Sequence, residues 1–250
     1  MNHTPRGRSD VIVGTAGWAI PRASAEAFPS EGSGLERYAA RFGGVEINST
    51  FYRSHRPQTL ARWRAATPAG FRFAVKAPKA ITHEAGLAGC GPRLAQFLDE
   101  IAPLEEKLGP ILVQLPPRAA FDAKVAGGFL SALRGLWDGP VTLEPRHASW
   151  FEADAGVLLS AHRVARVAAD PARVPAAATP SGFPGLAYWR LHGAPRPYYS
   201  AYSPRYLETL AAALTARRDG ETWCVFDNTA SGAAAANALT LAGRLGLLAP

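Results

Sequence analysis

The sequence predicts a single-domain α/β fold, a TIM-like (β/α)8 barrel. Three observations favour it: short apolar runs recur at near-regular spacing, helical patterns lie between most of them, and charged residues follow many of them directly. The chain has 250 residues, of which 48% are hydrophobic and 19% charged, which suits one domain with a large core. We expect residues 1–10 to be a flexible N-terminal lead and residues 11–250 to form the domain.

The predicted strands are short apolar or β-branched runs that stop at Gly, Pro or polar residues. They begin near Val11, Gly44, Phe71, Pro110, Pro140, Val164, Leu186 and Thr222. Their mean spacing is about 30 residues, the size of one strand followed by one helix. An open Rossmann-type sheet usually has a GxGxxG loop after its first strand, and GTAGW at 14–18 is not one, so the alternation favours the barrel.

Helices are predicted in most of the intervals from apolar spacing, N-terminal caps and Gly or Pro stops. Their ranges are 35–42, 58–66, 93–108, 122–137, 204–217 and 232–245. The interval after the sixth strand, PARVPAAATPSGFPG, is predicted to be a loop because prolines and small residues dominate it.

Composition limits the classes of partner. The net charge is +7, carried by 23 arginines and 4 lysines, and these are spread along the chain without the like-charge block of a nucleic-acid tail. No apolar run approaches the ~20 residues of a transmembrane helix, so we expect no membrane partner. The two cysteines, Cys90 and Cys224, cannot make a disulfide framework, and a cytoplasmic location is the expectation.

Charged residues at the carboxyl ends of the strands predict a functional site. In VTLEPRHASWF, residues 141–151, a buried strand runs straight into Glu144, Arg146 and His147, and barrel active sites lie at such strand ends. Alternation along each strand predicts that acids and cations face the barrel axis together. These are Glu46, Glu144, Asp170 and Asp227 with Lys76, Arg146, Arg166 and Arg190, although the register of the last strand leaves open whether Asp227 or Asn228 faces inward. Arg166 is expected to be a structural partner. A self-paired network of buried charges is the alternative interpretation.

Further residues are candidates for binding a substrate around this site. They are Trp18, Asn48, Tyr52, Lys79, Gln114, Arg146, Asp170, Arg190, Asn228, Thr229 and Ser231. The last three precede a predicted helix, whose free N–H groups favour an anion, although ordinary helix capping would use the same residue types. The tyrosine-rich segment 194–202 is expected to cover the substrate.

Taken together, these motifs resemble the YecE-like family, domain of unknown function 72, along nearly the whole chain. The matching segments are GTAGW (14–18), VEINSTFYR (45–53), FAVKAPKAITHE (73–84), LVQLPP (112–117), LEPRHASWF (143–151), AADP (168–171), YWRLHG (188–193) and VFDNTASGAAAANALTL (225–241). The resemblance implies a TIM-barrel-like fold and supplies no reaction. The first loop departs from the family pattern at Ala16 and at Ala19 and Ile20.

The function expected first is acid/base catalysis, of hydrolase, lyase or isomerase type, on a small anionic substrate such as a phosphorylated or acidic sugar. Cationic side chains, Lys76, Arg146 and Arg190, would hold the anion. Glu144 or Asp227 would act as general base, and His192 or Glu46 as general acid. Lys76 is alternatively a Schiff-base amine, but the arginines already account for an anion site without it.

Two other functions stay open. No cofactor is predicted, but a divalent metal would suit a hydrolase, isomerase or phosphoesterase, and its ligands would be Glu46, Glu144, Asp170, His192 and Asp227. Non-catalytic binding of nucleic acid or another anionic ligand is suggested by the pI of about 9.8. No nucleic-acid recognition motif is visible, and the sequence predicts no oligomeric state.

Overall fold

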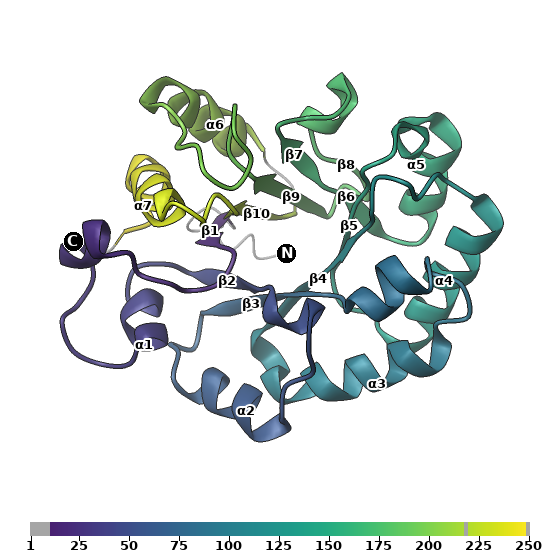
Figure 1. The fold of residues 1–250 in the computed structure, drawn as a ribbon, viewed down its shortest axis with the longest axis horizontal. Helices are drawn as coiled ribbons and strands as arrows, with labels where there is room; N and C mark the ends of the chain where they lie inside the picture. Colours follow the sequence, from purple (N-terminus) through teal and green to yellow (C-terminus); the bar gives the residue numbers. More distant parts are fainter. Residues whose placement is uncertain (1–10, 218–219, 249–250) are drawn as a thin grey trace, which may run out of the picture.

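The computed structural model describes residues 11–217 and 220–248; the predicted N-terminal lead, residues 1–10, lies outside them. The strands lie at the centre of the molecule and the helices surround them (Figure 1). In chain order the strands are β1 (Val11–Thr15), β2 (Gly44–Ile47), β3 (Arg72–Lys76), β4 (Leu108–Gln114), β5 (Val141–Glu144), β6 (Val164–Arg166), β7 (Ala168–Asp170), β8 (Ser181–Gly182), β9 (Leu186–Leu191) and β10 (Glu221–Phe226). Every predicted strand is present, the sixth being split into β6 and β7.

Hydrogen bonds divide these strands into two sheets, so the α/β class is confirmed but a closed (β/α)8 barrel is not. One sheet has the order β1-β10-β9-β7 and the other β2-β3-β4-β5-β6-β8. Their ladders are parallel except between β6 and the two-residue β8. A single bridge between Ala16 and Glu46 joins β1 to β2. The second boundary between the two sheets lies between β6 and β7, which follow each other in the chain.

The helices lie near the predicted ranges, except that α5 was not predicted. They are α1 (Gly34–Ala39), α2 (Pro57–Ala65), α3 (Gly91–Ile101), α4 (Ala123–Leu136), α5 (Ala153–Ala161), α6 (Pro204–Ala216) and α7 (Ala233–Arg244). Short turns of helix are η1 (Arg22–Ala27), η2 (Ser49–Phe51), η3 (Ala80–Glu84), η4 (Ala102–Lys107), η5 (Ala148–Phe151) and η6 (Pro175–Ala178). Between β7 and β9 the described chain has only the short turn η6 and the two-residue β8, in agreement with the predicted loop. Among the described residues, no helix is long and apolar enough to cross a membrane.

One predicted helix was too long. The range 93–108 is α3 followed by the separate turn η4, and Glu105 inside that turn has a positive φ of 48°. Pro103 begins the change, because proline cannot donate the backbone hydrogen bond that would continue the helix. Residue 108 already belongs to β4.

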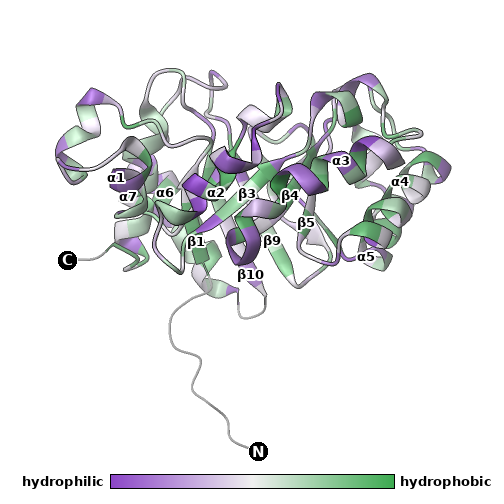
Figure 2. Cartoon of the chain, turned by 90° about the horizontal axis from the view of Figure 1, so that it is seen from below, coloured by the Kyte–Doolittle hydropathy of each residue, from purple (hydrophilic) through white to green (hydrophobic). Residues whose placement is uncertain are grey.

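Alternation along the strands separates two apolar clusters. One face packs against the helices, whose hydrophobic and hydrophilic residues are mixed along the outside (Figure 2). The other face encloses a smaller interior cluster of Ala74, Leu112, Ala165, Val167, Leu186, Tyr188, Trp223 and Val225. These residues come from strands of both sheets, so the two sheets share one interior.

Candidate functional site

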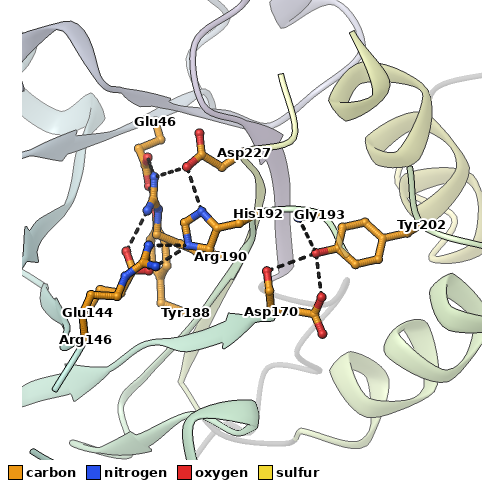
Figure 3. Close-up of polar contacts among 10 residues, drawn as sticks. All are labelled: Glu46, Glu144, Arg146, Asp170, Tyr188, Arg190, His192, Gly193, Tyr202 and Asp227. Atoms are coloured by element: carbon orange, nitrogen blue, oxygen red, sulfur yellow. Dashed lines mark hydrogen bonds and ion pairs between the residues drawn. The ribbon is translucent and has the colours of Figure 1, made fainter. Parts of the chain in front are cut away.

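A polar layer lies next to the interior cluster, nearer the carboxyl ends of the strands. Two residues beyond Tyr188 on β9 comes Arg190, and two beyond Val225 on β10 comes Asp227. Because side chains alternate along a strand, both stay on the interior face. Glu46 on β2 and Glu144 on β5 meet them there (Figure 3). The structure thus gathers groups from four strands that are far apart in the sequence.

Arg190 is the centre of this layer. Its Nε and Nη2 donate to Glu46 at 3.0 and 2.7 Å, its Nη1 donates to Glu144 Oε2 at 2.7 Å, and Nη2 also lies 3.1 Å from Asp227 Oδ2. Tyr188 O–H donates to Glu46 Oε2 at 2.8 Å. The guanidinium is fully buried and faces three carboxylates, so it fixes where those carboxylates point.

His192 is held between two of the same carboxylates. Its Nδ1 lies 3.0 Å from Asp227 Oδ2 and its Nε2 lies 2.8 Å from Glu144 Oε1. Arg146 Nη2 donates to Glu144 Oε1 at 2.8 Å, beside His192 Nε2. Both ring nitrogens lie within hydrogen-bonding distance of carboxylate oxygens, an arrangement that favours the imidazolium, while Arg146 Nη2 also lies 3.0 Å from Nε2.

Electrostatics agrees with this protonation state. Burial lowers the pKa of His192, but Glu144 and the hydrogen bond to Asp227 outweigh it, so the pKa is raised overall. Burial works in the opposite sense on the carboxylates, and Arg190 outweighs it, so the pKa of Glu144 lies well below its usual value and that of Asp227 is lowered. Arg190 thus stabilises the ionised forms of Glu144 and Asp227.

The carboxylates differ in access. Glu46 and Glu144 have no exposed side-chain surface, and each of their oxygens accepts from a protein donor. Asp227 keeps 11% of its side chain exposed. Its Oδ2 faces Arg190 and His192, whereas its Oδ1 has no hydrogen bond to any residue that the structure describes. Asp227 is thus the carboxylate that a ligand can reach.

A pocket of about 470 Å³ opens beside the layer, next to the loops after β7 and β9. Its lining residues are Arg146, Pro171, Ala172, Arg173, His192, Pro197 and Tyr198. The Tyr198 ring meets the His192 ring edge-on with centroids 5.8 Å apart. Two guanidinium groups and the His192 ring therefore face this pocket together with an aromatic ring, a combination suited to an anion.

This chain resembles known proteins in sequence and in structure. A family model described as "Protein of unknown function DUF72" matches residues 12–249. The chain belongs to this family. The resemblance drawn from the motifs is confirmed.

Curated relatives match over part of their length. The UPF0759 protein YecE of Escherichia coli strain K12 is 33% identical over 144 residues, which cover 56% of this chain and 50% of YecE. The UPF0759 protein YunF of Bacillus subtilis strain 168 is 28% identical over 151 residues, covering 56% of this chain and 52% of YunF. The alignments therefore span about half the length of these relatives.

Solved structures match over nearly the whole chain. A DUF72 family protein from Thermotoga maritima MSB8 has a TM-score of 0.77 and 28% identity, covering 94% of this chain and 99% of its own. Another, from Enterococcus faecalis V583, has a TM-score of 0.79 and 22% identity, covering 96% and 97%. The second likeness shows the fold alone. Together they support one architecture for DUF72 proteins.

Within this DUF72 chain, Asp170 does not join the polar layer, which corrects the sequence prediction. Its carboxylate accepts from the Tyr202 hydroxyl at 2.9 Å, on the side of α6 (Figure 3), and it lines a separate pocket with Tyr206 and Leu210. Asp170 pairs in register with Leu191, and Ala169 with Arg190. Asp170 therefore lies on the outer face of its strand.

Arg166 is on the outer face as well. It pairs in register with Leu143, donates to the Trp150 carbonyl at 2.8 Å and lies over the Phe151 ring. Its expected role as a structural partner agrees with these contacts, but its expected position inside the barrel was wrong. Arg166 and Asp170 do share a face, as the alternation predicted, but that face is the outer one.

The other predicted binding residues are scattered around the mouth. Trp18 packs edge-on against Trp63, and Tyr52 is 79% exposed. Lys79 pairs with Glu84 at 3.4 Å on the surface. Gln114 is the register partner of Glu144, and Asn48 Oδ1 is buried without a hydrogen-bond partner among the described residues. A binding role for each of these remains a prediction.

The residues proposed for an anion subsite before α7 hold a loop instead. Asn228 Nδ2 donates to the Ser200 carbonyl and to Asn237 Oδ1, both at 2.9 Å, and the Ser231 hydroxyl donates to the Tyr199 carbonyl. Thr229 is exposed, and its carbonyl accepts from the Gly232 N–H at 3.0 Å. These contacts fix segment 194–202, and the anion subsite remains a prediction.

Sequence reasoning missed Tyr188 and Arg173, and it included Tyr202 only as part of segment 194–202, without its contact to Asp170. Tyr188 precedes Arg190 by two residues, so alternation could have placed it in the interior. Tyr202 connects Asp170 to the Gly193 N–H, which donates to its hydroxyl at 2.8 Å. Arg173 reaches the pocket from a proline-rich loop, and no strand periodicity could have located it there.

The carboxylates do not suit a divalent metal. Arg190 occupies the space between Glu46, Glu144 and Asp227 and bonds to all three. Asp170 points away, and among the described residues no group of three or more His, Cys, Asp or Glu side chains is arranged to hold a metal. A cation placed in this layer would have to displace a guanidinium that is already fully paired.

Proposed function

We propose that the protein is an enzyme that performs acid/base chemistry on a small anionic substrate, phosphorylated or acidic-sugar-like, at the carboxyl ends of its strands. The observation that carries this proposal is the position of His192. It is held between Asp227 and Glu144, and it lines a pocket with Arg146. A preorganised imidazolium beside cationic side chains both attracts an anion and supplies a proton.

The roles within the site follow from access. His192 is the general acid, because its pKa is raised and the ring lines the pocket. Asp227 is the proton acceptor, because its Oδ1 is uncommitted and it is ionised. Arg146 and Arg173 hold the anionic group. Three further residues position His192 and Asp227, since these three are buried and bonded to one another: Arg190, Glu46 and Glu144.

The proposal also treats the two sheets as one barrel-like enclosure. It is supported by the shared interior cluster, to which Ala74 and Leu112 contribute from one sheet and Tyr188 and Trp223 from the other. Arg190 on one sheet also forms ion pairs with Glu46 and Glu144 on the other sheet. Loops after strands of both sheets then surround a common mouth, as in barrel enzymes.

Ligand-induced stabilisation tests the function. Wild-type protein, Arg146→Gln and the exposed-surface control Arg205→Gln are heated with phosphorylated sugars, carboxylated sugars and their neutral parents. We expect anionic members alone to raise the midpoint of wild type and the control, by an amount that grows with ligand concentration, and the rise to be lost in Arg146→Gln. Equal shifts in all three proteins, or none with any anion, would overturn the proposal.

A further inference from the structure

Lys76 has no hydrogen-bond acceptor among the residues that the structure describes. It ends β3 on the interior side, and its Nζ lies 4.3 Å from the centroid of the Phe51 ring. The side chain is half-buried. Glu46, Glu144 and Asp227 are near enough to act on its charge, but among the described residues Nζ has no hydrogen bond and no ion pair.

Other cations of the chain are committed differently. Lys107 Nζ donates to the carbonyls of Arg64 and Thr67 at 2.7 and 2.6 Å, and Lys79 pairs with Glu84. Arg190 and Arg146 are bonded to the carboxylates of the layer. Arg190 is therefore fully engaged inside the protein and Arg146 is shared between Glu144 and the pocket, whereas the Lys76 amine has no such partner among the described residues.

The surroundings of Lys76 favour its neutral form more than water does. Burial lowers its pKa, and Arg190 lowers it further, whereas Glu46, Glu144 and Asp227 oppose the change without cancelling it. The Phe51 ring lies under the ammonium group and, as a cation–π partner, opposes the loss of its charge. A lysine whose neutral form is favoured in this way is a better nucleophile for carbonyl carbon than one in water.

We propose that Lys76 is a covalent site, whose ε-amine attacks an aldehyde or ketone group of the substrate and forms an imine. This rests on the proposed function and narrows its substrate to an anionic carbonyl compound. The neutral amine adds to the carbonyl carbon, and a carbinolamine forms. The proton that nitrogen loses passes through Asp227 Oδ1 to the former carbonyl oxygen, a second proton comes from His192, and the hydroxyl leaves as water to give a protonated imine. One water is released and no electrons are transferred.

The pocket and the amine divide the recognition of such a substrate. Arg146 and Arg173 line the pocket beside β5 and β7, whereas Lys76 extends from β3. A substrate that spans the mouth would place its anionic end on the arginines and its carbonyl at Lys76. The resulting protonated imine would lie near the carboxylates of the layer, which stabilise its positive charge.

Borohydride trapping tests the inference. Full-length protein is incubated at neutral pH with glyceraldehyde 3-phosphate, or with neutral glyceraldehyde as a second probe, then reduced with borohydride and mapped by peptide mass spectrometry. We expect the reduced adduct on Lys76 in several-fold excess over Lys79, which serves as an internal control in the same molecule. The excess should be larger with the phosphorylated probe.

Variants separate this inference from the proposed function. Lys76→Arg keeps the charge and should lose the adduct, whereas Lys79→Arg should keep it. If anions stabilise the protein through Arg146 and Lys76 stays unlabelled by both probes, the imine is wrong and the anion site stands. If neither stabilisation nor labelling occurs, both proposals fail. Labelling of Lys76 no greater than that of Lys79 in wild type also overturns the imine, and this comparison does not depend on any variant folding.

Discussion

Arg190 shows how one side chain organises the site. It is fully buried and donates to carboxylates on three other strands. Burying charges costs several kcal/mol per ion unless each is paired with good geometry, and here the geometry is good throughout. The side chain therefore acts as a positioning residue, which holds Glu144 and Asp227 where they orient His192.

Removal of Arg190 tests this role. We expect Arg190→Met to lower the free energy of unfolding by about 3–5 kcal/mol, because Glu46 and Glu144 are then buried without their partner. Urea unfolding measures the loss, with Arg205→Met as a control on the exposed surface of α6 that should change stability by less than about 0.5 kcal/mol. A loss for Arg190→Met no larger than that of the control would contradict the account.

The pKa shifts predict how stability depends on pH. The pKa of His192 is raised, so its contribution is complete below the unfolded value of about 6.5 and is lost as pH rises through the folded value. The pKa values of Glu144 and Asp227 are lowered, so theirs are complete above about pH 4 and are lost as pH falls.

His192→Gln isolates the alkaline part of this dependence. We expect the stability difference between wild type and His192→Gln to be greatest below about pH 6.5 and to shrink at higher pH. Urea unfolding at a series of pH values from about 5.5 to 8.5 provides the measurement. Parallel stability profiles for the two proteins would show that the ring is not held as an imidazolium.

Period-two alternation along the strands made most of the site predictable from the sequence. It placed Glu46, Glu144, Arg190 and His192 on one face and left the choice between Asp227 and Asn228 open; the structure brings the first four together with Asp227 (Figure 3). It misplaced Asp170, because alternation fixes which residues share a face without saying which face is inside. Only the pairing of β7 with β9 decides that.

At the scale of an element, segment 194–202 between β9 and α6 is fixed by its neighbours. Asn237 on α7 is the main anchor: its Oδ1 accepts from the Tyr202 N–H at 3.0 Å and from Asn228 Nδ2 at 2.9 Å. The Ala230 N–H donates to the Tyr198 carbonyl at 3.0 Å. The backbone that places Tyr198 in the pocket lining is therefore fixed. Through Asn237, α7 contributes to the shape of the pocket.

Loss of this anchor should loosen the segment. We expect Asn237→Leu to cost about 1–3 kcal/mol, because the buried Tyr202 N–H and the Asn228 amide lose their acceptor. Hydrogen exchange of the backbone amides in 194–202 should accelerate, while exchange in the strands changes only in step with global stability. Thr240→Ala on the exposed side of α7 serves as the control. Unchanged exchange in Asn237→Leu would show that the segment is held elsewhere.

Element boundaries were less predictable than element types. Spacing and caps identified α1, α2, α4, α6 and α7, because each has a local start or stop signal. The end of α3 depends on the turn η4, where Glu105 adopts a left-handed φ that its side chain does not favour. That turn packs against α2 through Lys107, which donates to carbonyls there and just beyond. Local sequence patterns do not predict a tertiary contact of this kind.

At the scale of the whole molecule, Trp223 fills the space between the two sheets. It lies on β10 with no exposed surface and stacks on Tyr188 with ring centroids 6.0 Å apart. Glycines make room for it on the opposite sheet: a Cβ on Gly44 would lie 3.0 Å from its ring, and one on Gly109 2.9 Å. The apolar packing below the polar layer thus requires residues of both sheets.

A methyl group at Gly109 should disturb this packing. The added Cβ would also lie 3.1 Å from the Phe73 carbonyl, so the Trp223 ring must shift, and we expect Gly109→Ala to cost about 1–3 kcal/mol. Gly128→Ala is the matched control, since nothing lies within 4 Å of the added methyl on the exposed side of α4. There the substitution should stabilise by about 0.5–1 kcal/mol. Equal urea midpoints for the two variants would contradict this description of the interior.

The strand count and order were predictable from the sequence, but the closure of the sheets was not. Regular spacing gives parallel strands with helices between them. Whether hydrogen bonds close the last seam depends on local shifts such as the break between β6 and β7, for which the sequence has no signal. A net charge of +7 favours encounter with anions at this scale, and the identity of the anion depends on the pocket.

The central claim is that an anion binds beside a protonated His192. The direct measurement is an NMR titration of the six histidine rings, with His192 assigned by the His192→Gln variant, in the presence and absence of inorganic phosphate. A bound anion should raise the pKa of His192 further, and the added rise should be reduced in Arg146→Gln. A pKa of His192 that is the same with and without phosphate, or one below the ordinary histidine value in both, would contradict the account.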